Sequence, residues 1–161
     1  MIDPLASLPP DGGRVWYFPG AADHGQADIL ARVQRRDGSS WIACLARPGS
    51  GLGHEGIFAM PCGQRLFIAG GIADRDDPAS WTALPLRTPR ARWSPGRTVT
   101  VLSDGTSVHV FGTNGPLWSA TLGSDAGVTD VTNDTLVCDV YDWAAGTPVT
   151  RRFDLFTGQP R

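Results

Sequence analysis

The sequence has no lysine and only one glutamate, Glu55. Long solvated helices need such residues on their outer faces, so this composition excludes an α-helical bundle. All 14 basic residues are arginine, which we interpret as the composition of a GC-rich genome. Charged residues make up 19% of the chain and apolar residues 41%. That balance excludes disorder throughout the chain and leaves a core to be buried.

Long apolar runs and signals for export are also missing. No run approaches the roughly 18 residues of a membrane span, and residues 1–13 lack the basic and apolar regions of a signal peptide. The three cysteines show no Cys-x-x-Cys spacing, which disfavours zinc and suits a reducing compartment. We therefore expect a cytoplasmic protein without a membrane segment. Residues 1–13 are expected to form a flexible N-terminal segment before a single domain, residues 14–161.

Turn-forming residues are abundant, with 20 glycines and 13 prolines. Between the turns, a tryptophan followed two residues later by alanine recurs at intervals of about 40 residues, at Trp41, Trp81 and Trp118. In an extended strand these two side chains lie on one face. Each such segment follows a turn signal and an earlier strand-like run, at residues 28–34, 65–71 and 107–112. A fourth, less regular copy spans residues 135–142 and 148–155.

A further short strand precedes each copy, at residues 14–18, 56–60, 98–102 and 127–131. The sequence therefore predicts an all-β fold with about twelve short antiparallel strands in four three-stranded repeats. Self-similarity at this period is typical of a propeller-like stack of sheets, and a β-sandwich or barrel is the alternative. We expect Trp41, Trp81 and Trp118 to be equivalent core residues, and Trp143 to lie exposed in a turn.

The stretch 112–158 combines a turn glycine, a tryptophan strand, a short linking strand and a long hairpin. It ends in the motif Asp-Leu-x-Thr-Gly at residues 154–158. This stretch resembles the closing portion of a group of uncharacterised bacterial β-rich proteins. The shared residues are turn residues and core aromatics, so the resemblance implies a fold and carries no catalytic residue to this chain.

No motif reaches the specificity of a catalytic signature. The glycine-rich segment 49–56 has no following Gly-Lys-Ser/Thr, and the next segment is expected to be a strand, so it does not match a phosphate-binding loop. His24, His54 and His109 have no metal-ligand spacing. Cys62, at a Pro-Gly turn, is expected to be the most reactive thiol. We assign no catalytic residue, metal or cofactor, and enzyme activity stays open with a preference against it.

The most suggestive polar stretch is residues 86–97, where arginines surround a tryptophan and two prolines favour extended backbone. Arginine and tryptophan are enriched in the residues that contribute most to protein interfaces. We therefore predict a non-catalytic bacterial protein-binding module, of the immunity or inhibitor type. Two alternatives stay open: a small enzyme or ligand binder with a pocket between repeats, and RNA or single-stranded DNA binding. The predicted partner-binding residues are Arg87, Arg90, Arg92, Trp93 and Arg97.

Overall fold

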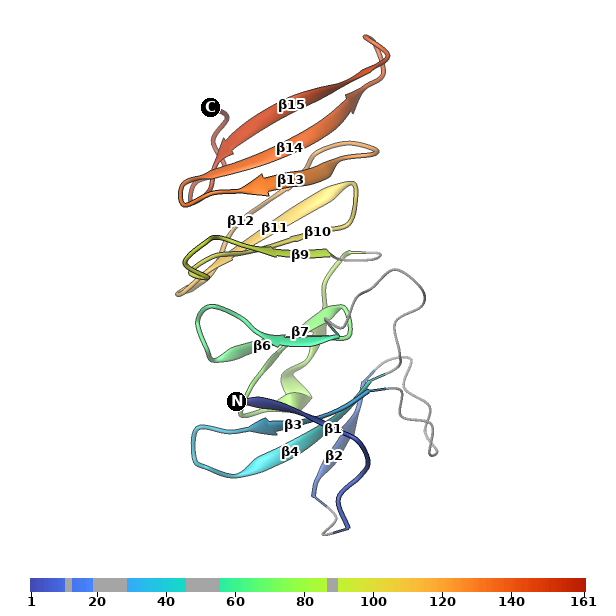
Figure 1. Cartoon of the computed structure of the whole chain (residues 1–161), viewed down its shortest axis with the longest axis vertical. Coiled ribbons are helices and arrows are strands. Elements are labelled where there is room, and N and C mark those ends of the chain that lie inside the picture. The colour runs from blue at the N-terminus through green and yellow to red at the C-terminus, as the bar shows by residue number, and fades with distance from the viewer. Residues whose placement is uncertain (11–12, 19–28, 46–55, 87–89) are drawn as a thin grey trace. The chain divides into compact units, whose positions relative to one another are not determined.

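The computed structural model describes residues 1–10, 13–18, 29–45, 56–86 and 90–161 (Figure 1). These residues form fifteen strands in four separate sheets, with one short 3-10 turn, η1 (Pro78–Ser80). The predicted all-β class is confirmed, and no sheet closes on itself. Within the described ranges no helix is long and apolar enough to cross a membrane.

The chain divides into two compact units, the first comprising Met1–Ala59 and Gly63–Pro85. Its sheet A has the order β1 (Ile2–Leu5), β3 (Ile29–Gln34), β4 (Ser40–Leu45), β2 (Val15–Tyr17). Its sheet B is a meander of β5 (Ile57–Ala59), β6 (Arg65–Ile68), β7 (Gly71–Asp74) and β8 (Thr82–Ala83). All pairings are antiparallel except that of β2 with β4. Residues 1–13, expected to be flexible, thus include a strand, and Pro4 is tolerated because β1 is an edge.

The second unit comprises Met60–Cys62 and Leu86–Arg161. Its sheet C is a meander of β9 (Arg90–Trp93), β10 (Thr100–Ser103), β11 (Ser107–Gly112) and β12 (Gly115–Thr121). Its sheet D contains β13 (Gly127–Val131), β14 (Thr135–Asp142) and β15 (Thr147–Asp154). All of these pairings are antiparallel. The strands lie close to the predicted runs because alternating apolar residues set both their position and their face.

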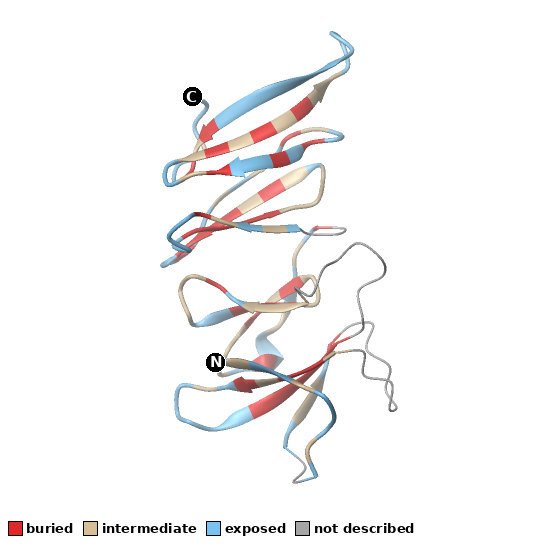
Figure 2. Ribbon diagram, viewed as in Figure 1, coloured by how far each residue is buried: buried red, intermediate tan, exposed pale blue. Residues whose placement is uncertain are grey.

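Sheets C and D bury a shared core between them. Along β14, buried and half-buried residues alternate, as the red and tan bands of Figure 2 show. Leu136 and Cys138 on this strand join Val108 and Val110 of β11 in one cluster. In the first unit, Trp41 and Val33 of sheet A form the corresponding cluster with residues of sheet B. Burying such side chains contributes roughly 1.5–3 kcal/mol each.

Two of the three repeated tryptophans make the same contacts. Trp41 lies opposite Val33, and its indole N–H donates to the carbonyl of Arg75, 2.9 Å away. Trp118 lies opposite Val110, and its indole N–H donates to the carbonyl of Leu155, also at 2.9 Å. In both units the accepting carbonyl directly follows the third strand of the next sheet. The same tryptophan contact from one sheet to the next therefore occurs twice, once in each unit.

The acceptor residues are held by matching turns. Asp74 and Asp154 end β7 and β15, and each carboxylate accepts a backbone N–H from two residues ahead. The next residue, Arg75 or Leu155, donates its own N–H at 2.8 Å to a carbonyl that directly precedes the second strand of its sheet. The Asp-Leu-x-Thr-Gly motif at 154–158 is thus a structural turn. It presents a backbone carbonyl to Trp118.

The prediction that Trp81 is equivalent to the other two is wrong. It directly follows η1 rather than lying in a strand, and its indole N–H donates to the carbonyl of Ile68 in its own sheet. The turn directly before Trp81 is η1, which begins after Asp77, and the β6–β7 hairpin turns earlier, at Ala69-Gly70, both with positive φ. Burial does not separate Trp81 from Trp118, since both are half-buried, whereas Trp41 is fully buried. Trp143, expected to be exposed, is 70% accessible.

Candidate functional site

The predicted partner-binding stretch forms an edge strand. Among the described residues, β9 pairs only with β10, so one side of its backbone has no neighbouring strand. Arg90 and Arg92 are exposed, while the alternate residues Ala91 and Trp93 are half-buried. Arg87 lies outside the described residues. The structure therefore brings Arg90, Arg92, Trp93 and Arg97 together at one edge of sheet C.

The register of β9 decides which way its side chains face. Arg92 lies opposite Val101 and Arg90 opposite Ser103, so both arginines extend from the face that packs on sheet D. Trp93 lies opposite Thr100 on the other face. Neither Arg90 nor Arg92 forms an ion pair with a described carboxylate. Two like charges thus stand at alternate positions on one face of an open edge.

The backbone of β9 offers hydrogen-bonding groups to a further strand. The Ser94 N–H donates to the carbonyl of Val99 at 3.0 Å, so the backbone N–H and carbonyl of Ser94 point toward the β10 side. Because residues in a strand alternate in this respect, the N–H and carbonyl of Ala91 point away from β10. No described group binds them. An extended segment of another chain therefore finds both a donor and an acceptor at Ala91.

A tight turn fixes the end of this edge. The carbonyl of Ser94 accepts the N–H of Arg97 at 2.8 Å, and the buried Ser94 hydroxyl accepts the N–H of Val99 at 3.1 Å. Arg97 has a φ of 53°, a left-handed conformation that costs a non-glycine residue roughly 1–2 kcal/mol. Its guanidinium lies 5.7 Å from the centre of the Trp93 ring. The turn thus holds a third cation beside the edge and covers the indole with it.

The remaining chemical candidates do not converge. His24, His54 and most of the glycine-rich segment 49–56 lie outside the described residues. His109, on β11, has its pKa lowered by desolvation. Burial, with a smaller contribution from Asp139, raises the pKa of the Cys138 thiol to about 11, so this thiol is a poor nucleophile at neutral pH. Within the described part of the chain no three histidine, cysteine or acidic residues gather as metal ligands.

A hollow of about 500 Å³ in the first unit is occupied by its own ion pair. Arg35, Arg36, Asp37 and Asp76 line it. The backbone N–H and guanidinium of Arg36 both donate to Asp76, and these contacts hold the pKa of that carboxyl below its usual range. The Arg36–Asp76 pair is thus satisfied internally, whereas the buried Nε of Arg35, which lines the same hollow, has no hydrogen-bond partner among the described residues.

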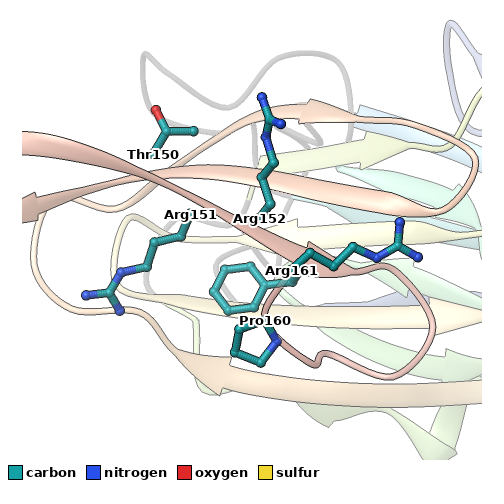
Figure 3. Close-up of a pocket in the computed structure, with 6 residues that line it drawn as sticks. Thr150, Arg151, Arg152, Pro160 and Arg161 are labelled. Atoms are coloured by element: carbon teal, nitrogen blue, oxygen red, sulfur yellow. The ribbon is translucent and has the colours of Figure 1, made fainter.

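Sequence reasoning missed a second polar surface, at the edge of β15. Thr150, Arg151 and Arg152 line a hollow of about 560 Å³ there, together with Phe153, Pro160 and Arg161 (Figure 3). Thr147–Arg152 are all exposed, although they belong to a strand. The adjacent arginines and the preceding Pro148 were the sequence features that could have indicated an exposed edge strand here. Their position at an edge depends on the pairing of β15 with β14 alone among the named strands.

Comparison with known proteins identifies no relative: no family model, curated protein or solved structure matches this chain. The resemblance to bacterial β-rich repeat proteins therefore stays a prediction.

Proposed function

We propose that this chain is a non-catalytic protein-binding module that takes an extended acidic segment of another protein onto the open edge of β9. The observation that carries the proposal is the pair Arg90 and Arg92, exposed on one face of an edge strand without a described acidic partner. The proposed module is of the inhibitor or immunity-protein class, and it acts in a reducing cytoplasm. A propeller-like array of the four sheets belongs to the same proposal.

Edge strands recognise extended peptides by adding them as a further strand. Backbone hydrogen bonds at Ala91 would supply affinity without sequence information. Acidic side chains at alternate positions of the peptide would then face Arg90 and Arg92, since directly opposite residues share a face of the sheet. Arginine forms charge-assisted, often bidentate bonds with carboxylates. Such charges also accelerate encounter with an acidic partner.

The alternatives have less support on this surface. A module for single-stranded nucleic acid stacks bases on open aromatic faces, whereas the Trp93 ring is half-buried and lies against Arg97. The formal net charge of −2 also gives no general attraction for a polyanion. No cluster of described residues favours a small-molecule pocket.

The test uses the intact chain and a labelled peptide with alternating glutamate and valine, so that glutamates lie on one face of the added strand. We expect the triple variant Arg90→Ala, Arg92→Ala, Trp93→Ala to weaken binding by at least ~2 kcal/mol, measured by fluorescence anisotropy. Thermal melting of the same variant distinguishes a loss of binding from a loss of folding. Unchanged binding contradicts the proposal, and loss of the folded state assigns Trp93 to the core.

Three single variants distinguish a loss of binding from a folding defect. Arg92→Glu and Arg65→Glu change the net charge equally, and both positions are exposed, but Arg65 lies on β6 in the first unit. The proposal predicts loss of peptide binding for Arg92→Glu alone. Ala91→Pro removes the outward N–H without removing an internal hydrogen bond, and it too should abolish binding. Equal losses for Arg92→Glu and Arg65→Glu would mean that only overall charge matters.

A further inference from the structure

The edge of β15 already accepts an extended segment. Residues 159–161 run antiparallel to it, with Pro160 bridged to Phe153. The N–H of Asp154 donates to the carbonyl of Gln159 at 2.8 Å, and the N–H of Arg161 donates to the carbonyl of Arg152 at 2.9 Å. This short segment covers the end of the edge. The rest of β15, toward Thr147, has no strand beside it among the described residues.

These two hydrogen bonds also show which backbone groups face outward. The N–H of Asp154 and the carbonyl of Arg152 point away from β14. Because strand residues alternate, the N–H and carbonyl of Thr150 and the carbonyl of Pro148 also point away from β14. No described group binds the N–H or carbonyl of Thr150. Pro148 has no N–H to leave unsatisfied at this edge. The open edge therefore continues the line of residues 159–161 with acceptors at Pro148 and Thr150 and a donor at Thr150.

Two unneutralised charges flank this edge. Arg151 and Arg152 leave β15 on opposite sides, as Figure 3 shows, and neither forms an ion pair with a described carboxylate. Arg161, which lines the same hollow, is different. It donates to Asp134 at 2.7 Å and to Asp154 at 2.5 Å. The cations available for a partner are thus Arg151 on one face of the strand and Arg152 on the other.

We infer that the β15 edge is a second docking site, which binds an extended segment of another protein with two adjacent acidic residues. The segment adds antiparallel to β15 and continues the line of residues 159–161. Its first acidic residue lies opposite Arg151, and the next lies opposite Thr150, on the face from which Arg152 extends. A third, apolar residue lies opposite Val149, which is 40% exposed.

Charge selects this occupant over a second copy of the chain. Pairing two β15 edges would bring Arg151 and Arg152 of each copy close to those of the other, and like charges across a strand pair are destabilising. Arginines and a proline on an edge are also the devices by which proteins prevent self-association of strands. An acidic segment meets no such repulsion. This site is separate from β9, so the two can be tested independently.

The experiment measures binding of a fluorescein-labelled Glu-Glu-Val-Thr-Val-Ser peptide to the intact chain by fluorescence anisotropy. We expect saturable binding that Arg151→Ala combined with Arg152→Ala weakens about tenfold, as two exposed charge pairs together would. Thr150→Pro removes the outward N–H and should abolish binding. Thr150→Val is its matched control, since it loses only the hydroxyl that donates to Asp139 at 2.7 Å. It should bind normally.

The peptide supplies its own controls. N-methylation of the second glutamate blocks the N–H that would donate to the Thr150 carbonyl, whereas N-methylation of the following valine alters an N–H that points away. Only the first modification should prevent binding. Circular dichroism checks that each protein variant keeps its β structure.

Three results would overturn the inference. A Lys-Lys-Val-Thr-Val-Ser peptide that binds equally well would remove the role of charge. Equal affinity for a single-stranded oligonucleotide, reduced by the same arginine variants, would make the surface a general polyanion site. Concentration-dependent dimerisation lost in Thr150→Pro would assign the edge to a second copy. The Arg92→Glu variant of β9 should bind this peptide unchanged, so failure of one site leaves the other standing.

Discussion

Replacement of Gly158 by alanine should cost more stability while Trp118 is present than after Trp118 is replaced by leucine. Gly158 has a φ of +72°, and a Cβ built there would lie 2.7 Å from the Cδ2 atom of the Trp118 indole. The left-handed backbone costs alanine roughly 1–2 kcal/mol, and overpacking against a rigid ring costs typically about 1–3 kcal/mol more. In a Trp118→Leu background only the backbone contribution remains. The two substitutions should therefore show a coupling energy of about 1–3 kcal/mol.

Gly146 provides the matched control for this cycle. Its φ is +68°, and nothing lies within 4 Å of an added Cβ. Gly146→Ala should cost only the backbone contribution, roughly 1–2 kcal/mol, with or without Trp118. Urea unfolding followed by far-UV circular dichroism gives all the free energies of unfolding. Additive effects of Gly158→Ala and Trp118→Leu would refute the argument that the turn at 154–158 is fitted to the indole.

Three further outcomes are expected. Trp41→Ala should lower the free energy of unfolding by roughly 3–5 kcal/mol, and Trp143→Ala by less than about 1 kcal/mol, in the same urea assay; similar losses would contradict the burial difference. The Arg161 guanidinium, with backbone N–H groups of Thr157 and Phe156, lowers the pKa of Asp154 to about 2. Stability from this depressed pKa is present above the ordinary value near 4 and is lost as the pH falls toward 2. Arg161→Met should therefore lower the free energy of unfolding at neutral pH, and its stability should approach that of the parent protein at pH 2. A stability difference that stays constant with pH would refute this prediction. Cys62 should react first in a native thiol titration, because Cys44 and Cys138 are buried; early reaction of Cys138 would contradict its raised pKa.

The sequence predicted the strands better than their partners. Alternation of apolar residues is a local signal, and it located β11, β13, β14 and β15 within a residue or two. The parallel pairing of β2 with β4 depends on contacts far apart in the chain, which periodicity does not encode. Trp81 was misassigned because Pro78 begins a 3-10 turn that takes it out of the strand, although its sequence pattern matches that of Trp41 and Trp118.

The residues of the candidate site could be predicted from the sequence, but their place in a sheet could not, because strand pairing is not a local signal. Arg90, Arg92 and Trp93 were recognisable by composition, and the prolines indicated extended backbone around them, but no local pattern indicated a strand partner. Pairing with β10 makes Arg90–Trp93 a strand with one open side. Arg151 and Arg152 were seen as part of a strand, yet only the order of sheet D places them on its edge.

Amide hydrogen exchange at Ala91 tests the central proposal most directly. Its N–H points away from β10 and should exchange rapidly in the intact chain alone. Saturation with the alternating glutamate–valine peptide should slow this exchange at least about tenfold, because an added strand supplies the missing acceptor. The amide of Arg92, which already faces β10, should change far less. Peptide binding that leaves Ala91 exchange unaltered would contradict recognition through the edge of β9.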